Sequence, residues 1–434
     1  MRTEKARKQS QNIRVIKGKD TYVWSQGATR KETRMTEAAV EKAASSGGRL
    51  ESIDFVRGLV MVIMALDHVR DFFTNLTFEP ENLEPTWMGL FLTRWVTHFC
   101  APLFFFLAGT GAYFYGKRRT KGELSRFLWT RGLWLAILEF TLIGTAWTFV
   151  FPWGFFGVIW SLGFSMIILA AVVRLPMKWI AGLSVAVICL HDLLDKVRPA
   201  SFGAWGWVWN MLHAKGGANI FGWHEFVLFP LVPLCAVMAA GYAFGALLPR
   251  SDRRVWMLRL GTAMTVAFLL LRLTNLYGNP PALRGGVTPG DWHVQPTMEK
   301  TVILFLDTEK YPPSLQFLLM TLGPGLLLLG FLDGGKILKL FRPVLMFGRV
   351  PMFFYVLHLY WIHALAVIVA LLMHQPYDWL LHGGFWFFGL PDGYGHGLAF
   401  VYLMWAIVLV TLYFPCRWFA GVKERRREWW LSYF

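Results

Sequence analysis

The sequence predicts an all-α, polytopic membrane protein with about ten transmembrane helices and both termini in the cytoplasm. Its mean hydropathy is +0.43 and 55% of its residues are hydrophobic, which is more apolar than a soluble chain. Apolar runs of about 20 residues, the length that crosses a bilayer, recur along the chain. Lys and Arg gather in alternate loops between these runs, as the positive-inside rule requires.

Ten apolar runs are long enough to be transmembrane spans. We expect them at residues 54–74, 89–116, 127–150, 155–173, 177–194, 224–248, 256–273, 314–332, 346–373 and 398–418. The short loops at 75–88, 151–154 and 374–397, which we expect outside, contain no Lys or Arg. The two long outside loops, 195–223 and 274–313, carry a few, and the loops expected inside are basic. An even number of spans with both ends inside satisfies this alternation.

The net charge of +16 points to lipid contact and not to nucleic acid. The basic residues lie in short loops and in the tails, where they meet anionic membrane lipids. We expect residues 1–48 to be a disordered basic cytoplasmic tail and residues 419–434 a second basic cytoplasmic tail. The region between them, 49–418, is the predicted transmembrane domain.

The first expected span, RLESIDFVRGLVMVIMALDHVRDFF (49–73), carries charge inside its apolar length. Arg57 and His68 are eleven positions apart, so at about 100° per residue they share one helix face to within roughly 20°, about 16 Å apart along the axis. Asp67 precedes the histidine. Ionisable groups inside a membrane are costly and usually functional. The alternative is a membrane anchor whose polar side chains are satisfied by neighbouring helices.

Further polar residues fall in or beside other expected spans. Arg94 and His98 lie one turn apart on one face near the outer end of the second span. An interfacial arginine that reaches toward water, and a packed histidine, are the alternatives to a functional role. Glu139, midway along the third span, is expected to pair with an arginine or histidine of a neighbouring span.

The remaining polar residues mark the ends of spans or one face of the ninth. His191 and Asp192 end the fifth expected span, and His224 and Glu225 begin the sixth, where interfacial roles compete with functional ones. In the ninth span His358 and His363 point about 140° apart, so they do not share one small site, and His358 is the better candidate.

Several site classes lack their sequence patterns. No two histidines stand at metal-ligand spacing beside a carboxylate, so we expect no metal site. Neither a phosphate-binding glycine loop nor a nucleophile elbow is present. A buried histidine could still act as a general base, or accept an acyl group covalently. The arginines Arg57, Arg126 and Arg131 could hold the phosphate-rich head of an acyl donor.

The stretch 49–73 resembles the first catalytic-domain helix of the heparan-α-glucosaminide N-acetyltransferase family, in its bacterial branch. The stretches TRWVTHFCAPLFFFLAGTGAYF, YPPSLQFLLMTLGPGLLLL and GRVPMFFYVLHLYWIHALA resemble further blocks of that branch. Arg57 and His68 also match the Arg-x10-His signature of related membrane O-acyltransferases. The resemblance implies a ten-helix acyltransferase domain over 49–418 in a bacterial inner membrane. It further implies acetyl-CoA as the acyl donor and an outward-facing acceptor, an amino sugar or other glycan.

On this reading His68 is the base or acyl carrier, Asp67 tunes it, and His98 is the second candidate for the base. Arg94, His358 and Glu139 are assigned to the acceptor side, and the donor arginines to acetyl-CoA. The rival hypothesis is a proton-coupled secondary transporter that uses the same buried groups. A scaffold or sensor without chemistry is the third. A homodimer is compatible with the sequence.

Overall fold

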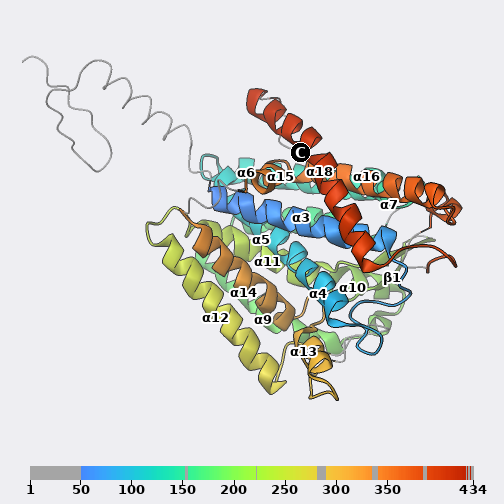
Figure 1. Ribbon diagram of the computed structural model, residues 1–434. Coiled ribbons are helices and arrows are strands. Elements are labelled where there is room, and N and C mark those ends of the chain that lie inside the picture. Colours follow the sequence, from blue (N-terminus) through green and yellow to red (C-terminus); the bar gives the residue numbers. More distant parts are fainter. Residues whose placement is uncertain are drawn as a thin grey trace, which may run out of the picture. The chain divides into compact units, whose positions relative to one another are not determined.

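The computed structural model describes residues 50–151, 155–220, 222–280, 290–334, 341–384 and 389–426, together with residues 428 and 431. The expected tail at 1–48 lies outside the described residues. The described chain is mostly helical (Figure 1). Its first half contains α3 (Glu51–Phe73), α4 (Met88–Thr97), α5 (Cys100–Gly116), α6 (Lys121–Leu138), α7 (Gly144–Thr148), α8 (Val158–Val172), α9 (Met177–Leu190), α10 (Gly206–Leu212) and α11 (Leu231–Gly245). Its second half contains α12 (Arg253–Thr274), α13 (Met298–Leu306), α14 (Leu315–Leu332), α15 (Arg342–Arg349), α16 (Pro351–Leu372), α17 (Asp378–Leu381) and α18 (Leu398–Arg425).

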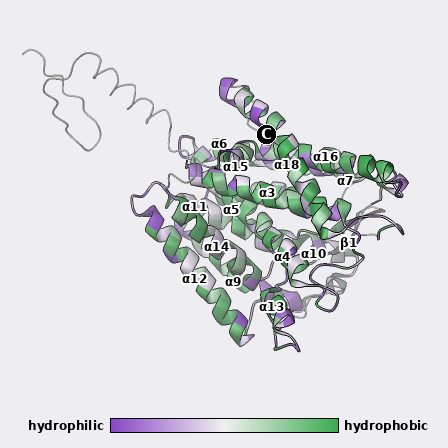
Figure 2. Cartoon of the chain, in the orientation of Figure 1, coloured by the Kyte–Doolittle hydropathy of each residue, from purple (hydrophilic) through white to green (hydrophobic). Residues whose placement is uncertain are grey.

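Among the described residues, seven helical segments are long and apolar enough to cross a membrane. They are Met88–Gly116, Lys121–Thr148, Met177–Lys196, Arg253–Thr274, Leu315–Leu332, Pro351–Leu372 and Leu398–Arg425. Figure 2 shows these long helices largely covered by hydrophobic residues, with hydrophilic residues at helix ends and in loops. The prediction of a polytopic helical membrane protein is therefore confirmed.

Three of the ten expected spans are helices that fall outside this set of seven. The helices α8 and α11 are apolar but only 15 residues each. The helix α3 has 23 residues, yet it carries six charged side chains. These are Glu51, Asp54, Arg57, Asp67, Arg70 and Asp71.

The charged helix α3 lies in the middle of the helix packing. It contacts α4, α5, α14, α15, α16 and α18. Most of its residues are buried, including Asp54, Arg70 and Asp71. A helix with this much charge is accommodated because neighbouring helices, and not lipid alone, surround it.

The predicted start of the sixth span, with His224 and Glu225 as its first residues, is wrong. Trp223–Val227 forms strand β2, which pairs antiparallel with β1 (Gly216–Ile220), with Ala218 opposite Glu225. The helix α11 begins only at Leu231, after Pro230, whose ring fixes the backbone dihedral at the helix entrance. A two-stranded hairpin therefore replaces the first turns of the expected helix.

The helices α3 and α15 approach closely through a pair of glycines. A Cβ at Gly58 would collide with the carbonyl oxygen of Val344, and one at Gly348 would collide with the carbonyl oxygen of Asp54. Small residues at helix contacts let backbones approach in this way. The contact also brings Arg57 to the carbonyl oxygen of Gly348, at 3.4 Å.

Replacing Gly58 with alanine should lower the melting temperature of the purified protein. The added methyl group must push the α15 backbone away, and overpacking of this kind costs about 1–3 kcal/mol. The matched control is Gly111→Ala on α5, where an added Cβ meets nothing within 4 Å. Equal melting temperatures for the two variants would contradict the proposed close contact.

Candidate functional site

Two histidines from distant parts of the chain meet at the candidate site. His68 on α3 and His358 on α16 lie with Nδ1 of the first 2.7 Å from Nε2 of the second. Their rings are stacked with centroids 5.0 Å apart. On its other side, Nδ1 of His358 lies 3.0 Å from the carbonyl oxygen of Phe354. The sequence singled out both histidines, and the structure brings them together.

This arrangement selects one tautomer for each ring. A carbonyl oxygen only accepts, so Nδ1 of His358 carries the proton that it donates to Phe354. With both rings neutral, Nε2 of His358 then accepts a hydrogen bond from Nδ1 of His68. The lone pair of His68 is therefore at Nε2, which makes this atom available as a base.

Aromatic residues surround the histidine pair. Trp147 contacts the ring of His68 edge-on with centroids 4.9 Å apart, and Tyr355 does so at 6.3 Å. His358 is fully buried, whereas His68 is only partly buried. One ring is thus held inside the protein and orients a second ring that is partly exposed.

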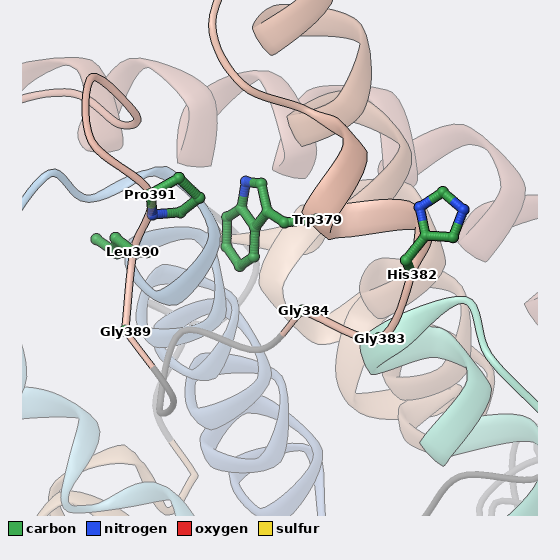
Figure 3. Close-up of a pocket in the computed structure, with 7 residues that line it drawn as sticks. All are labelled: Trp379, His382, Gly383, Gly384, Gly389, Leu390 and Pro391. Carbon is green, nitrogen blue, oxygen red and sulfur yellow. The ribbon is translucent and has the colours of Figure 1, made fainter.

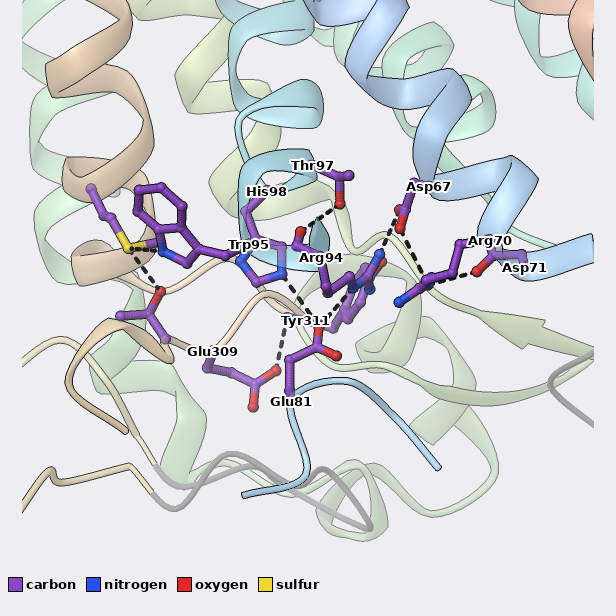
Figure 4. Close-up of polar contacts among 12 residues, drawn as sticks. Asp67, Arg70, Asp71, Glu81, Arg94, Trp95, Thr97, His98, Glu309 and Tyr311 are labelled. Carbon is purple, nitrogen blue, oxygen red and sulfur yellow. Dashed lines mark hydrogen bonds and ion pairs between the residues drawn. The ribbon is translucent and has the colours of Figure 1, made fainter. Parts of the chain in front are cut away.

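A chain of ion pairs begins at Asp67, the residue before His68, and Figure 4 shows its members. Nη1 of Arg94 lies 2.5 Å from Asp67, and its Nε lies 2.7 Å from Glu81. Nε2 of His98 lies 3.3 Å from the same oxygen of Glu81. Arg70 bridges Asp67 and Asp71 at 3.2 and 2.6 Å.

Glu81 stays ionised in this chain. Burial would raise the pKa of the Glu81 carboxyl, but the Arg94 guanidinium and the hydrogen bond from His98 outweigh it and hold that pKa well below its usual range. Arg94 is thus committed to two carboxylates, and it fixes the loop that carries Glu81 against α3 and α4.

A third segment, Glu309 to Tyr311, completes the cluster. The backbone N–H of Tyr311 donates to Oε1 of Glu309 at 2.9 Å. The charge of Lys310 acts electrostatically on Asp67 and His68. A cation near a reacting centre can stabilise negative charge that develops on a reacting oxygen.

Several buried polar atoms of this cluster have no hydrogen-bond partner among the described residues. They include Oε2 of Glu81, Oε2 of Glu309 and Nδ1 of His98, and the cation Arg70 leaves its Nη1 without such a partner as well. Buried polar atoms in native proteins are nearly always satisfied by protein, water or ligand. Two carboxylate oxygens and an imidazole nitrogen fit a ligand that carries amine or hydroxyl groups.

The three candidate donor-binding arginines lie on α3 and α6. Arg57 is partly buried and pairs with Asp54 at 3.3 Å. Arg126 is exposed on α6, and the guanidinium of Arg131 lies 5.8 Å from the ring of Phe127. Their role in binding a donor stays a prediction.

The expected pairing of Glu139 with an arginine or histidine is wrong. Its Oε2 accepts a hydrogen bond from the backbone N–H of Trp160, at 2.7 Å, in the first turn of α8. The free N–H groups and the dipole of a helix N-terminus stabilise a carboxylate as a cation would. Glu139 begins a π-helical turn, Glu139–Ile143, and we assign it a structural role.

A second buried titratable cluster lies at the end of α9. His213 contacts Asp195 at 2.7 Å and His191 contacts Asp192 at 3.2 Å. Asp192 also accepts the backbone N–H of Leu315 at the start of α14. The described residues contain no group of three or more His, Cys, Asp or Glu side chains that could hold a metal ion.

A shallow pocket of about 440 Å³ opens elsewhere (Figure 3). It is lined by Trp379, His382, Gly383, Gly384, Gly389, Leu390 and Pro391. None of these residues belongs to the histidine pair or to the ion-pair chain. We therefore place the candidate site by its chemistry and not by this pocket.

Sequence reasoning missed Arg70, Asp71, Glu81, Glu309 and Lys310. Arg70 stands three positions after Asp67, the spacing of an ion pair on a helix, and so was accessible to pattern analysis. The acidic loop at 75–88, which has no basic residue, hinted at a partner for Arg94. No local pattern marks the segment 309–311, because its role depends on a contact made across more than 200 residues.

Comparisons with known proteins connect this site to a family. A family profile described as heparan-alpha-glucosaminide N-acetyltransferase, catalytic, matches residues 49–274. The match includes α3 to α12, and with them His68, Asp67, Glu81 and the Arg94–His98 turn. His358 and the 309–311 segment lie beyond it. No curated protein matches the chain.

The pH dependence of stability should reveal Glu309. Burial raises the pKa of its carboxyl, so the stability that this group contributes is lost as the pH rises through the raised pKa. Glu309→Gln keeps an acceptor for Tyr311 and removes the buried charge. We expect the variant to melt a few degrees above the wild type near pH 8, with the difference shrinking toward pH 4.5. Glu84→Gln, at an exposed loop position, is the control, and a pH-independent difference for Glu309→Gln would contradict the assignment.

Proposed function

The chain belongs to the family of heparan-alpha-glucosaminide N-acetyltransferase catalytic domains, and from this premise we propose that it transfers an acetyl or similar acyl group from cytoplasmic acyl-CoA to an outward-facing amine or hydroxyl. The acceptor is an amino sugar or another glycan. The family is one of membrane acetyltransferases that use acetyl-CoA. The single observation that carries the proposal is the His68–His358 contact, which leaves Nε2 of His68 free as a base.

In the proposed reaction, Nε2 of His68 removes a proton from the acceptor as its nitrogen or oxygen attacks the thioester carbon. The carbon–sulfur bond breaks, and the proton passes from His68 to the leaving thiolate. The ammonium of Lys310, whose charge acts on His68, stabilises the oxyanion that forms between these steps. The unpartnered carboxylate oxygens of Glu81 and Glu309 hold the donor groups of the acceptor.

We place this reaction in a ten-span domain of a bacterial inner membrane, with both termini in the cytoplasm. The seven long apolar helices, together with α3, α8 and α11, supply the helices for such a layout. The alternation of basic and uncharged loops supports the orientation. In this orientation Arg57, Arg126 and Arg131 lie toward the cytoplasm, where guanidinium groups suit the phosphates of CoA.

One observation favours a second function, a proton-coupled transporter. The charges of Lys215, Glu81 and Asp195 act on Glu309. The segment that follows Glu309 also contacts the second titratable cluster, where the backbone N–H of Leu315 donates to Asp192. Linked ionisable groups inside a membrane protein are typical of proton paths. Proton-driven uptake of a glycan into proteoliposomes, without acyl turnover, would favour this function over the transferase.

Replacing His68 with alanine should abolish acyl transfer while the protein stays folded. Loss of a general base costs about 100-fold or more in rate. The assay follows radiolabelled acetyl-CoA incubated with the purified protein and a glycan extract. His224→Ala, at an exposed strand position, should retain the wild-type rate. Transfer that continues in His68→Ala would remove His68 from the mechanism and make His98→Gln the next variant to measure.

Replacing His358 should slow the same reaction in a graded way. His358→Phe leaves Nδ1–H of His68 without an acceptor, and we expect a loss of about fivefold or more, since one such hydrogen bond is worth roughly 1 kcal/mol or more. His358→Gln offers an amide oxygen at a similar place and should lose less. The measurement is kcat with saturating donor. Equal rates for the two variants would show that His358 fills space and does not orient His68.

A further inference from the structure

The short helix α13 holds the loop that carries Glu81. Nζ of Lys300, in the first turn of α13, lies 2.7 Å from the carbonyl oxygen of Leu83, 3.1 Å from that of Glu84 and 2.5 Å from that of Thr86. An ammonium group has three N–H donors, so this set uses all of them. A single side chain thus gathers three carbonyl groups of a loop more than 200 residues away in the sequence.

The neighbouring residue extends this contact to α4. Oε1 of Glu299 accepts a hydrogen bond from the backbone N–H of Met88, at 2.7 Å, at the first residue of α4. The same helix carries Arg94, the partner of Glu81. Glu299 and Lys300 together therefore hold both the end of the loop and the start of the helix that it leads into.

The other end of α13 is fixed by a buried arginine. Arg272, which is fully buried, donates to the carbonyl oxygens of Leu304, Phe305 and Asp307 at 2.6 to 2.8 Å. These carbonyl groups stand at a helix C-terminus, where cations are stabilising. The backbone N–H of Glu309 then donates to Oδ1 of Asn279 at 2.8 Å. The segment that brings Glu309 and Lys310 to the site thus leaves α13 in a fixed direction.

We infer that α13 is a clasp, that is, a helix that fixes the two loops of the candidate site, the loop that carries Glu81 and the segment that carries Glu309 and Lys310. Lys300 is the positioning residue of this clasp. Lys300 acts through the backbone of the 83–86 segment and sets where Glu81 stands against Arg94 and His98. The consequence of this inference for acceptor binding rests on the proposed function. Its structural part, the coupling of Lys300 to Glu81, stands independently of any activity.

A double-mutant cycle tests that coupling. Lys300→Met removes the three hydrogen bonds without a large change in side-chain volume. If Lys300 positions Glu81, Glu81→Gln should lower the melting temperature less in the Lys300→Met protein than in the wild type, because the ion pair is already loosened there. The matched control is Lys178→Met at an exposed position of α9, in whose background the effect of Glu81→Gln should be unchanged. Additive effects in the Lys300→Met background overturn the inference.

Hydrogen exchange gives a second readout that does not depend on activity. Amides of residues 83–88 should exchange about tenfold faster in Lys300→Met, the factor expected when the equivalent of one charge-assisted hydrogen bond is lost. Lys300→Arg, which keeps the charge and several donors, should restore much of the protection. Unchanged exchange in Lys300→Met would show that the loop does not depend on Lys300.

Acyl-transfer kinetics test the consequence for the site. Lys300→Met should raise KM for the acceptor about tenfold and change kcat far less, because an altered Glu81 position weakens acceptor binding. Coupling and exchange as expected, with an unchanged acceptor KM, would overturn the positioning role. Absence of transfer in the wild type would overturn the proposed function, while the cycle and the exchange data would still decide whether the clasp exists.

Discussion

The pairing of Arg94 with two carboxylates is the constraint on which the candidate site depends. A guanidinium that is almost fully buried needs anions beside it, because removing one partner of a buried ion pair costs about 3–5 kcal/mol. Asp67 comes from α3 and Glu81 from the following loop, at 2.5 and 2.7 Å from Arg94. The ion pairs of Arg94 therefore fix the position of the loop at 75–88, and they place the carboxylate of Glu81 beside His98. Three of the six charged side chains of α3, Asp67, Arg70 and Asp71, belong to this chain of ion pairs, and Asp54 and Arg57 form a separate pair.

The histidine pair supplies what the ion pairs do not, an imidazole in a fixed orientation, which we propose as the base. The ring of His358 is oriented by a hydrogen bond to a backbone carbonyl oxygen, and a carbonyl oxygen is always the acceptor. The ring of His358 in turn orients the ring of His68 through the 2.7 Å contact between them, although their two helices are far apart in the sequence. The nearby carboxylates of Asp67, Asp71 and Glu81 form ion pairs with Arg94 and Arg70. These carboxylates are therefore neutralised by arginines and not by a protonated His68.

The two loops of the site are joined by contacts that carry no chemistry of their own. Within the part of the chain that the structure describes, Lys300 and Arg272 donate hydrogen bonds to backbone carbonyl groups, three for Lys300 and four for Arg272. Such cations order irregular backbone without competing for substrate. The arrangement separates two tasks, in which α13 holds the loops and the residues that the loops carry, Glu81, Glu309 and Lys310, are those that we propose to bind the ligand.

The sequence by itself determined the membrane class, the approximate places of the helices, and the face of α3 that carries Arg57 and His68. These follow from hydropathy and helical periodicity, which are local properties of the chain. It also selected His358 without showing its partner. Only the tertiary structure decided that His358 meets His68, that Glu139 pairs with a helix N-terminus, that a hairpin precedes α11, and that Glu81 and Lys310 join the site. Each of these depends on contacts between segments distant in sequence or on turn geometry, and periodicity contains no information about either.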